Sequence, residues 1–142
     1  MNKEQTFTIF GGTGDLTFRK RIPALYNMAA ADNEQLNGQI VIIGRRDYTS
    51  EAYRKLAGEW VEKFARLSYR EEIYKELAER IVYYRMDFTD EEEYKGLDEF
   101  YRASGAGGHI FYFAVAPRFF GTIVKGLQKV EGAGSGKVVI EK

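Results

Sequence analysis

The stretch TIFGGTGDLTFRKRIPALYN, residues 8–27, decides the fold because a short apolar run ends in three glycines within four positions. The apolar and β-branched residues at 6–10 predict a buried strand. Helical spacing of apolar side chains then runs through residues 16–31, beyond the glycines. A strand that passes through a tight glycine turn into a helix is typical of the first unit of a parallel α/β sheet.

The rest of the chain repeats this alternation of strand and helix. Further strands are expected at 39–44, 81–86, 109–115 and 137–141, with helices at about 50–66, 69–80, 90–104 and 117–130. Unbroken apolar strands joined by helical crossovers imply a parallel sheet that is buried on both faces. We therefore predict an α/β fold, a Rossmann-like doubly wound parallel sheet with helices on both faces. A ligand is expected beyond the carboxyl ends of the strands.

Local signals add detail to these helices. Pro23 lies too deep in residues 16–31 for a clean helix start, so we expect a kink or a split there. Thr49 or Ser50 is expected to cap the next helix, and Thr89 with Glu92 predicts a capping box. Helical spacing also predicts core packing for three apolar side chains, Trp60, Phe64 and Leu67.

The length and composition of the chain exclude several classes of partner and site. The 142 residues suffice for one domain, and 21 Lys plus Arg balance 21 Asp plus Glu, so we expect no nucleic-acid partner and no membrane partner. No apolar run approaches the roughly 20 residues of a membrane span. Cysteine is absent, which excludes disulfides and thiolate metal sites, and no metal is expected. The N-terminus shows no signal-peptide pattern, so a cytoplasmic location is expected.

The glycine turn, residues 11–16, is the first candidate site. Without Cβ atoms at 11, 12 and 14, phosphate oxygens can approach the main chain, and free N–H groups with the helix dipole would face the anion. The third small position of the dinucleotide pattern is Thr17 rather than glycine. Asp15 suits a helix N-cap, and Thr13 suits either a phosphate contact or solvent. The alternative is a turn that only connects strand to helix.

The end of the second strand, Gly44-Arg45-Arg46-Asp47, is the second candidate site. An NAD-binding fold usually places an acidic residue here, where it accepts the hydrogen bond of the ribose 2′-hydroxyl. Two guanidinium groups instead suit a 2′-phosphate, so this tip favours NADP over NAD. The alternative is a pair of solvated arginines with Asp47 as a partner for one of them.

These residues resemble the glucose-6-phosphate dehydrogenase family. The run from Ile9 to Asn27 is similar to the opening signature of that family, a G-x-x-G-D-L core followed by basic residues and a proline. The resemblance continues in order through four later segments, GRRDYT at 44–49, RMDF at 85–88, FYFAVAP at 111–117 and VIEK at 139–142. It departs at Ala116, where the family often has a proline, and at Phe18, where it often has a lysine.

The resemblance implies a coenzyme domain for NADP-dependent oxidation of D-glucose 6-phosphate to 6-phospho-D-glucono-1,5-lactone, a step of the pentose phosphate pathway. It implies that residues 11–18 line the pyrophosphate, that Arg45 takes the 2′-phosphate, and that Asp87 and Phe88 lie by the adenosine. The implied substrate-binding residues are Lys20 and Lys142. The implied cofactor-binding residues are Gly11, Gly12, Thr13, Gly14, Asp15, Leu16, Thr17, Phe18, Arg45, Arg46, Asp87, Phe88, Ala114 and Lys142.

The resemblance also indicates what residues 1–142 lack. Catalysis in the family needs a histidine base paired with an aspartate, in an R-I-D-H-Y-L-G-K-E motif that this sequence does not contain. Its one histidine, His109, is expected at the opposite end of the sheet as a structural or surface residue. We therefore assign no catalytic residue here and expect one NADP-binding domain over 1–142, without the β+α substrate and dimerisation domain.

Three expectations follow for the chain alone. It should not oxidise glucose 6-phosphate, which it should bind only with the missing domain, and an exposed apolar surface should favour self-association.

A short-chain dehydrogenase would need Tyr-x-x-x-Lys, and a P-loop hydrolase would need G-x-x-x-x-G-K-[ST]; the sequence contains neither. A non-catalytic NADP-sensing module and a truncated remnant that binds nothing stay as alternatives.

Overall fold

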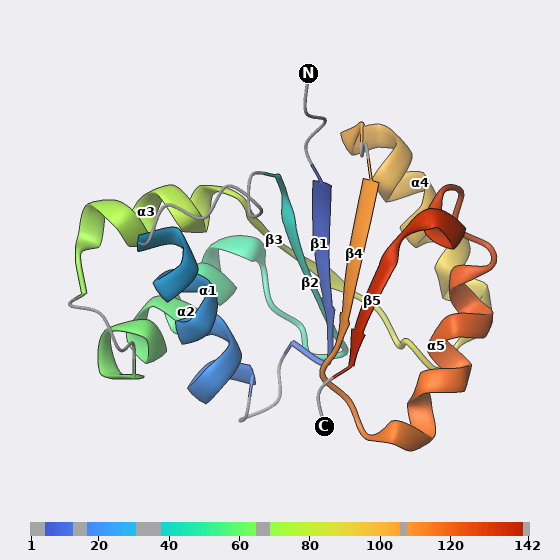
Figure 1. Cartoon of the computed structure of the whole chain (residues 1–142), viewed down its shortest axis with the longest axis horizontal. Coiled ribbons are helices and arrows are strands. Elements are labelled where there is room, and N and C mark those ends of the chain that lie inside the picture. The colour runs from blue at the N-terminus through green and yellow to red at the C-terminus, as the bar shows by residue number, and fades with distance from the viewer. Residues whose placement is uncertain (1–4, 13–16, 31–37, 65–68, 106–107, 141–142) are drawn as a thin grey trace.

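The computed structural model describes residues 5–12, 17–30, 38–64, 69–105 and 108–140. Its centre is a single sheet of parallel strands in the order β3-β2-β1-β4-β5 (Figure 1). The strands are β1 (Gln5–Phe10), β2 (Ile40–Gly44), β3 (Ile81–Arg85), β4 (Gly108–Phe113) and β5 (Lys137–Ile140). The predicted parallel α/β fold is confirmed, with all five strands close to their predicted positions.

Helices cover both faces of this sheet (Figure 1). One layer holds α1 (Ile22–Ala30), α2 (Ser50–Phe64) and α3 (Glu71–Glu79), and the other holds α4 (Tyr94–Ser104) and α5 (Phe120–Leu127). Four short helical segments complete the described chain, η1 (Thr17–Arg21), η2 (Glu91–Glu93), η3 (Pro117–Phe119) and η4 (Ala133–Ser135). Within these described ranges, no helix is long and apolar enough to cross a membrane.

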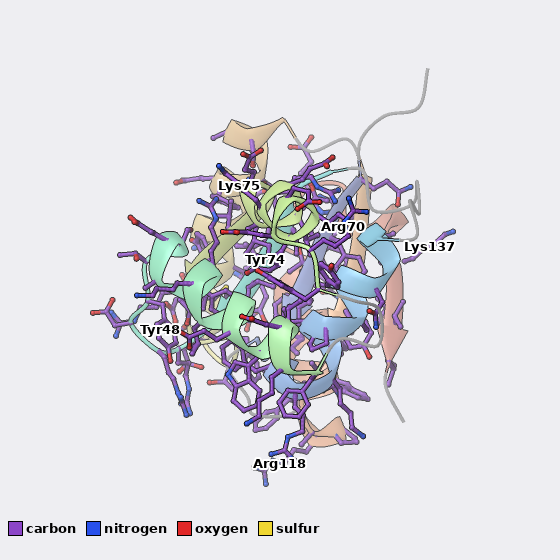
Figure 2. The ribbon with its side chains drawn as sticks, turned by 90° about the vertical axis from the view of Figure 1, so that its left-hand side faces the viewer. Tyr48, Arg70, Tyr74, Lys75, Arg118 and Lys137 are labelled. Carbon is purple, nitrogen blue, oxygen red and sulfur yellow. The ribbon has the colours of Figure 1, made fainter. Side chains whose placement is uncertain are left out.

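The core has two halves because successive strand residues point to opposite faces of the sheet. Ile9 packs in the half beneath α1, α2 and α3, whereas its neighbour Phe10 packs in the half beneath α4 and α5. All five residues of β2 are buried, as its unbroken apolar run predicts. Figure 2 looks onto the α1–α3 layer.

Pro23 divides the first helical region, as predicted. Residues 17–21 form the π-helical turn η1, and α1 then begins at Ile22 with Pro23 as its second residue. At this place the missing N–H of proline falls among the first donors of a helix, which have no partner within the helix in any case. The ring therefore sets where α1 begins.

The predicted caps are confirmed at one helix and wrong at another. Thr49 caps α2, because its Oγ1 accepts from the amide of Ala52 over 3.0 Å. Thr89 does not cap the following helical turn, because its hydroxyl donates to Asp87 Oδ1 over 2.6 Å. Asp90 takes that role and accepts from the amide of Glu92 over 3.0 Å. The nearby Asp87 carboxylate competes for the Thr89 hydroxyl, and Asp90 is the stronger cap in its place.

The expected aromatic packing on α2 is only partly present. Trp60 is half-buried against the core, whereas Phe64 is 37% exposed and stacks on Trp60 with ring centroids 5.3 Å apart. Phe64 is therefore a surface residue, and the prediction that it lies in the core is wrong. Leu67 lies outside the described residues.

Candidate functional site

The carboxyl ends of the parallel strands meet at one edge of the sheet. The strand order changes direction between β1 and β4, because β2 and β3 lie on one side of β1 and β4 and β5 lie on the other. Gly11 lies at this switch point with a positive φ of 88°. A Cβ there would come within 2.4 Å of the carbonyl oxygen of Ala114, the residue that follows β4. The glycine turn therefore starts where a doubly wound sheet binds its ligands, with Ala114 as its close neighbour.

The absence of a side chain at Gly12 also serves the packing of the protein itself. A Cβ at this position would lie 2.0 Å from Cγ2 of Ile42 on β2. Real Cβ atoms do not approach a neighbour so closely, so a side chain here would displace the turn or the strand. Glycine is required at this place for the turn to lie against β2.

The first two amides of the glycine turn pair with the sheet, which the sequence does not show. Gly11 and Gly12 both donate to the carbonyl of Ile43, over 3.1 and 2.9 Å. These two N–H groups extend the pairing of β1 with β2, so the expectation that they are free to bind an anion is wrong. The remaining predicted residues of the turn, Thr13, Gly14, Asp15 and Leu16, lie outside the described residues, as does the side chain of Thr17.

A buried tyrosine holds the glycine turn in place. The hydroxyl of Tyr53, on α2, donates to the carbonyl of Gly12 over 2.6 Å. Burial raises the pKa of this phenol well above its ordinary value, so the hydroxyl keeps its proton. Phe18, 4% exposed, packs on Tyr53 with ring centroids 5.2 Å apart. Any contact of Phe18 with a pyrophosphate must therefore come from its main chain.

The loop after β2 presents its two arginines at the surface. Arg45 and Arg46 are both exposed. The carbonyl of Arg46 accepts from the hydroxyl of Tyr83 over 2.6 Å and from the amide of Tyr48 over 3.1 Å. These bonds fix the main chain of the loop, and both arginine side chains are exposed to solvent.

A cavity of ≈ 360 Å³ lies at the ends of β2 and β3, lined by Arg45, Arg85, Met86, Asp87 and Glu93. It brings together Arg45 and Asp87, two of the residues that the resemblance assigns to the coenzyme, whereas Arg46 does not line it. Arg85 and Glu93 were missed by the sequence reasoning. The signal for Arg85 was available in principle, because parallel pairing places it beside Gly44 at the predicted tip.

Hydrogen bonds fix the acidic wall of this cavity. Asp87 Oδ1 accepts from the hydroxyl and the amide of Thr89, over 2.6 and 2.9 Å. These two bonds are the main reason why the pKa of Asp87 lies below its ordinary value. Glu93 Oε2 accepts from the amide of Asp87 over 3.0 Å. Both side chains are therefore held before any ligand arrives.

The other predicted residues lie around the same edge. Phe88 is half-buried and meets Phe119 edge to face, with centroids 5.3 Å apart. Lys20 is exposed on η1, which follows the glycine turn. Lys142 lies outside the described residues. His109 is buried in β4, near the end of the strand remote from this edge, so the prediction of a structural residue is confirmed.

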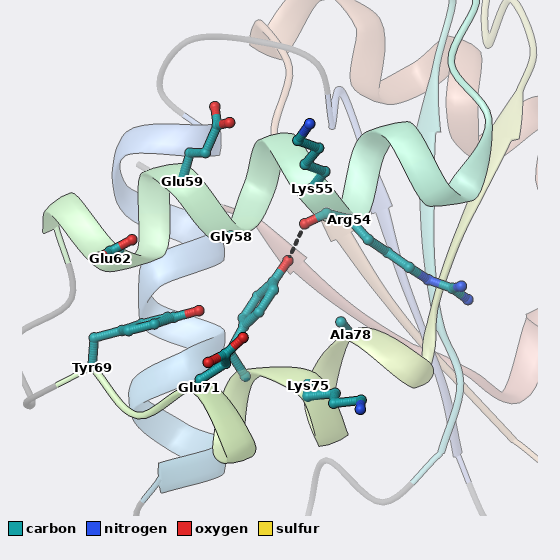
Figure 3. Close-up of a pocket in the computed structure, with 10 residues that line it drawn as sticks. Arg54, Lys55, Gly58, Glu59, Glu62, Tyr69, Glu71, Lys75 and Ala78 are labelled. Carbon is teal, nitrogen blue, oxygen red and sulfur yellow. Dashed lines mark hydrogen bonds between the residues drawn. The ribbon is translucent and has the colours of Figure 1, made fainter.

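A larger cavity of ≈ 420 Å³ lies between α2 and α3, away from the strand ends (Figure 3). Tyr74 lines it and donates its hydroxyl to the carbonyl of Arg54. Its rim mixes acidic and basic side chains, so it offers no charge preference for an anionic ligand. In the described parts of the chain, no three His, Asp or Glu side chains are grouped to hold a metal ion.

Comparison with known proteins gives one consistent result. Residues 8–142 match the family model described as the NAD binding domain of glucose-6-phosphate dehydrogenase. Glucose-6-phosphate 1-dehydrogenase of Streptococcus pneumoniae is 30% identical over 100% of this chain and 30% of its own length. The enzyme of the same name from Leuconostoc mesenteroides is 34% identical over 95% of this chain and 29% of its own length.

Solved structures agree with this comparison. The crystal structure of glucose-6-phosphate 1-dehydrogenase from Mycobacterium avium superposes with a TM-score of 0.84 at 27% identity. The match covers 100% of this chain and 30% of that chain. The chain therefore spans about 30% of the length of the relatives that it matches.

Proposed function

This chain belongs to the glucose-6-phosphate dehydrogenase family through its NAD binding domain, and on that premise we propose that residues 1–142 form an NADP-binding domain. The observation that carries the choice of NADP is the cavity at the ends of β2 and β3, into which Arg45 faces beside Asp87. A guanidinium group forms paired, charge-assisted hydrogen bonds with a phosphate. An acidic residue in the place of Arg45 would instead favour the free 2′-hydroxyl of NAD.

We propose that the coenzyme lies along the edge formed by the carboxyl ends of the strands. The pyrophosphate would lie over the glycine turn, where Gly11 and Gly12 bring the main chain close to β2 and β4. The 2′-phosphate would meet Arg45, with the adenosine beside Asp87 and Phe88. From there the dinucleotide would cross the switch point toward Ala114, so that its nicotinamide half lies near the end of β4.

For the whole protein we propose the oxidation of D-glucose 6-phosphate to 6-phospho-D-glucono-1,5-lactone. NADP, when bound, would supply the acceptor for the hydride that leaves C1 of the sugar. This chain would supply Lys20 and Lys142 toward the sugar phosphate and the nicotinamide. A base must take the proton of the C1 hydroxyl, and the one histidine of the sequence is buried in β4 away from the site. We therefore propose that residues 1–142 alone bind the coenzyme without turnover, and that a further domain binds the sugar.

Calorimetric titration of the purified chain with NADP and with NAD tests this proposal. We expect tighter binding of NADP, and we expect Arg45→Ala to weaken NADP binding by about tenfold while leaving NAD binding within about twofold. Equal affinity for both dinucleotides, or binding of neither, would contradict the proposal. Addition of glucose 6-phosphate with NADP should give no absorbance from NADPH.

The alternative of an NADP-sensing module rests on the same burial of His109 far from the coenzyme edge. A sensing module would show the same preference for NADP. It would differ from the dehydrogenase in having no domain that binds the sugar. Expression of the complete reading frame separates the two, since only the dehydrogenase would then produce NADPH. The expected cytoplasmic location stays a prediction, which imaging of the tagged complete protein would test.

We also propose that the chain associates with itself through β5. This strand forms one of the two edges of the described sheet, and its three apolar side chains, Val138, Val139 and Ile140, are 46%, 42% and 49% exposed. An edge strand offers unpaired main-chain donors and acceptors, which a second copy can match. Light scattering should detect a dimer whose population falls with Val139→Lys, and a monomer at all concentrations would contradict this.

A further inference from the structure

We propose that Arg85, rather than Arg46, is the partner of Arg45 in recognising the 2′-phosphate. This inference rests on the proposed function and names a specificity-determining residue that the sequence motifs do not indicate. Two neighbouring arginines in the sequence suggest a pair that acts together. In the structure the pair that shares the cavity comes from two different segments, the loop after β2 for Arg45 and the end of β3 for Arg85.

Strand pairing places Arg85 beside the tip of β2. In the parallel register Arg85 lies opposite Gly44, the residue immediately before Arg45. Its Nε donates to the carbonyl of Arg45 over 3.0 Å. This bond fixes the inner end of the guanidinium group. Of the two outer nitrogens, Nη1 lies in an exposed ion pair with Asp47, which a ligand in the cavity can replace. A group that is oriented in this way loses little freedom when it binds a phosphate.

Arg46 is placed differently. Its carbonyl is bound by the Tyr83 hydroxyl and by the Tyr48 amide, and its side chain is exposed outside the cavity lining. The loop therefore turns at this residue, so that the side chains of Arg45 and Arg46 do not converge on the cavity. The function expected for Arg46 from its sequence position falls to Arg85.

The charge of the cavity gives Arg85 its effect on selectivity. Asp87 and Glu93 line the cavity together with the two arginines, and Asp47 lies 3.9 Å from Nη1 of Arg85. The pair of Arg85 with Asp47 is exposed on both sides, so a doubly charged phosphate can displace this carboxylate readily. Without Arg85, one guanidinium group would face the carboxylates alone, and they would repel a 2′-phosphate far more than a 2′-hydroxyl.

The test measures the dissociation constants of NADP and NAD by calorimetry for the full chain and four variants. Arg85→Ala should weaken NADP binding by about tenfold and leave NAD within about twofold, as Arg45→Ala does. Arg46→Ala should change neither by more than about twofold. Arg70→Ala removes an exposed arginine remote from the cavity and controls for the loss of a surface charge. Thermal unfolding of each variant reports whether it is folded.

A second ligand pair removes the nicotinamide from the comparison. Adenosine 2′,5′-bisphosphate should lose affinity in Arg85→Ala, whereas adenosine 5′-monophosphate should not. Arg85→Lys keeps a charge but loses the Nε bond to Arg45, so it should restore only part of the affinity and serves if the alanine variant does not fold.

The outcomes separate this inference from the proposed function. If Arg45→Ala abolishes the preference for NADP while Arg85→Ala keeps it, the proposed function stands and the inference is overturned. A loss in Arg46→Ala as large as that in Arg85→Ala would also overturn it. If the unaltered chain prefers neither dinucleotide, both proposals fail.

Discussion

The rings of Tyr53 and Tyr83 stack with centroids 5.2 Å apart and planes 18° from parallel, and each donates its hydroxyl to a different loop of the coenzyme edge. Tyr53 holds the carbonyl of Gly12 in the glycine turn, and Tyr83 holds the carbonyl of Arg46 after β2. One aromatic pair therefore sets the distance between the loop proposed to hold the pyrophosphate and the loop proposed to hold the 2′-phosphate.

Tyr53→Phe should weaken both the fold and the coenzyme site. The substitution keeps the stacked ring but leaves the Gly12 carbonyl without its donor in a buried place. We expect the free energy of unfolding in urea to fall by about 1–3 kcal/mol, the usual cost of an unsatisfied buried group. NADP should bind several-fold more weakly because the turn loses its anchor. Tyr48→Phe removes a hydroxyl from the same cluster without affecting Gly12, and an equal loss there would contradict this role.

Alkaline pH should destabilise the fold through the same tyrosines. Burial, the largest cause, raises the pKa of Tyr83 to about 12 from an ordinary value of 10.0. Between these values the unfolded chain loses its phenolic proton while the folded chain keeps it. The free energy of unfolding should therefore fall as the pH rises from about 10 to about 12. Urea titrations across this range should show a shallower fall in Tyr83→Phe, and an unchanged slope would exclude Tyr83 as a contributor.

The sheet could be predicted because its central strands have only one compatible environment. Ile40 to Ile43 form an unbroken apolar run that needs cover on both faces, and the glycines after β1 mark the turn to the first helix. These features are local, so the sequence shows them directly. The family signature over the same residues agrees with the matched family model.

The details of the site depend on pairings that a sequence does not display. Arg85 at a strand end looks like any solvated arginine until the register places it beside Gly44. The amides of Gly11 and Gly12 look free because a turn is read separately from the sheet, yet both still pair with Ile43. Tyr53 reads as an ordinary core residue of a helix, and only the fold brings its hydroxyl to Gly12.

Gly12→Ala should be strongly destabilising. The added Cβ would lie 2.0 Å from Cγ2 of Ile42, and both residues are buried, so the turn or β2 must move. We expect a loss of about 1–3 kcal/mol in the free energy of unfolding, the usual cost of overpacking a core. Gly121→Ala is the matched control. A Cβ there meets nothing within 4 Å in α5, so this change should be neutral or stabilising by up to about 1 kcal/mol. Equal effects of the two substitutions would show that the contact with Ile42 does not limit the turn.

His109 should make the fold sensitive to mild acid. The ring is 7% exposed, stacks on Phe111 with centroids 5.1 Å apart and meets Tyr101 edge to face at 4.5 Å. Its Nδ1 is buried without a partner among the described residues, and burial lowers the pKa below the ordinary 6.5. The folded chain therefore holds the neutral ring, and the stability that this ring contributes is present above pH 6.5 and lost as the pH falls below it.

His109→Phe keeps an aromatic ring in the stack and cannot be protonated. Its free energy of unfolding should change less than that of the unaltered chain between about pH 7 and pH 5, a range above the ordinary pKa of aspartate and glutamate. Parallel curves for the two proteins would assign the acid sensitivity to carboxylates instead.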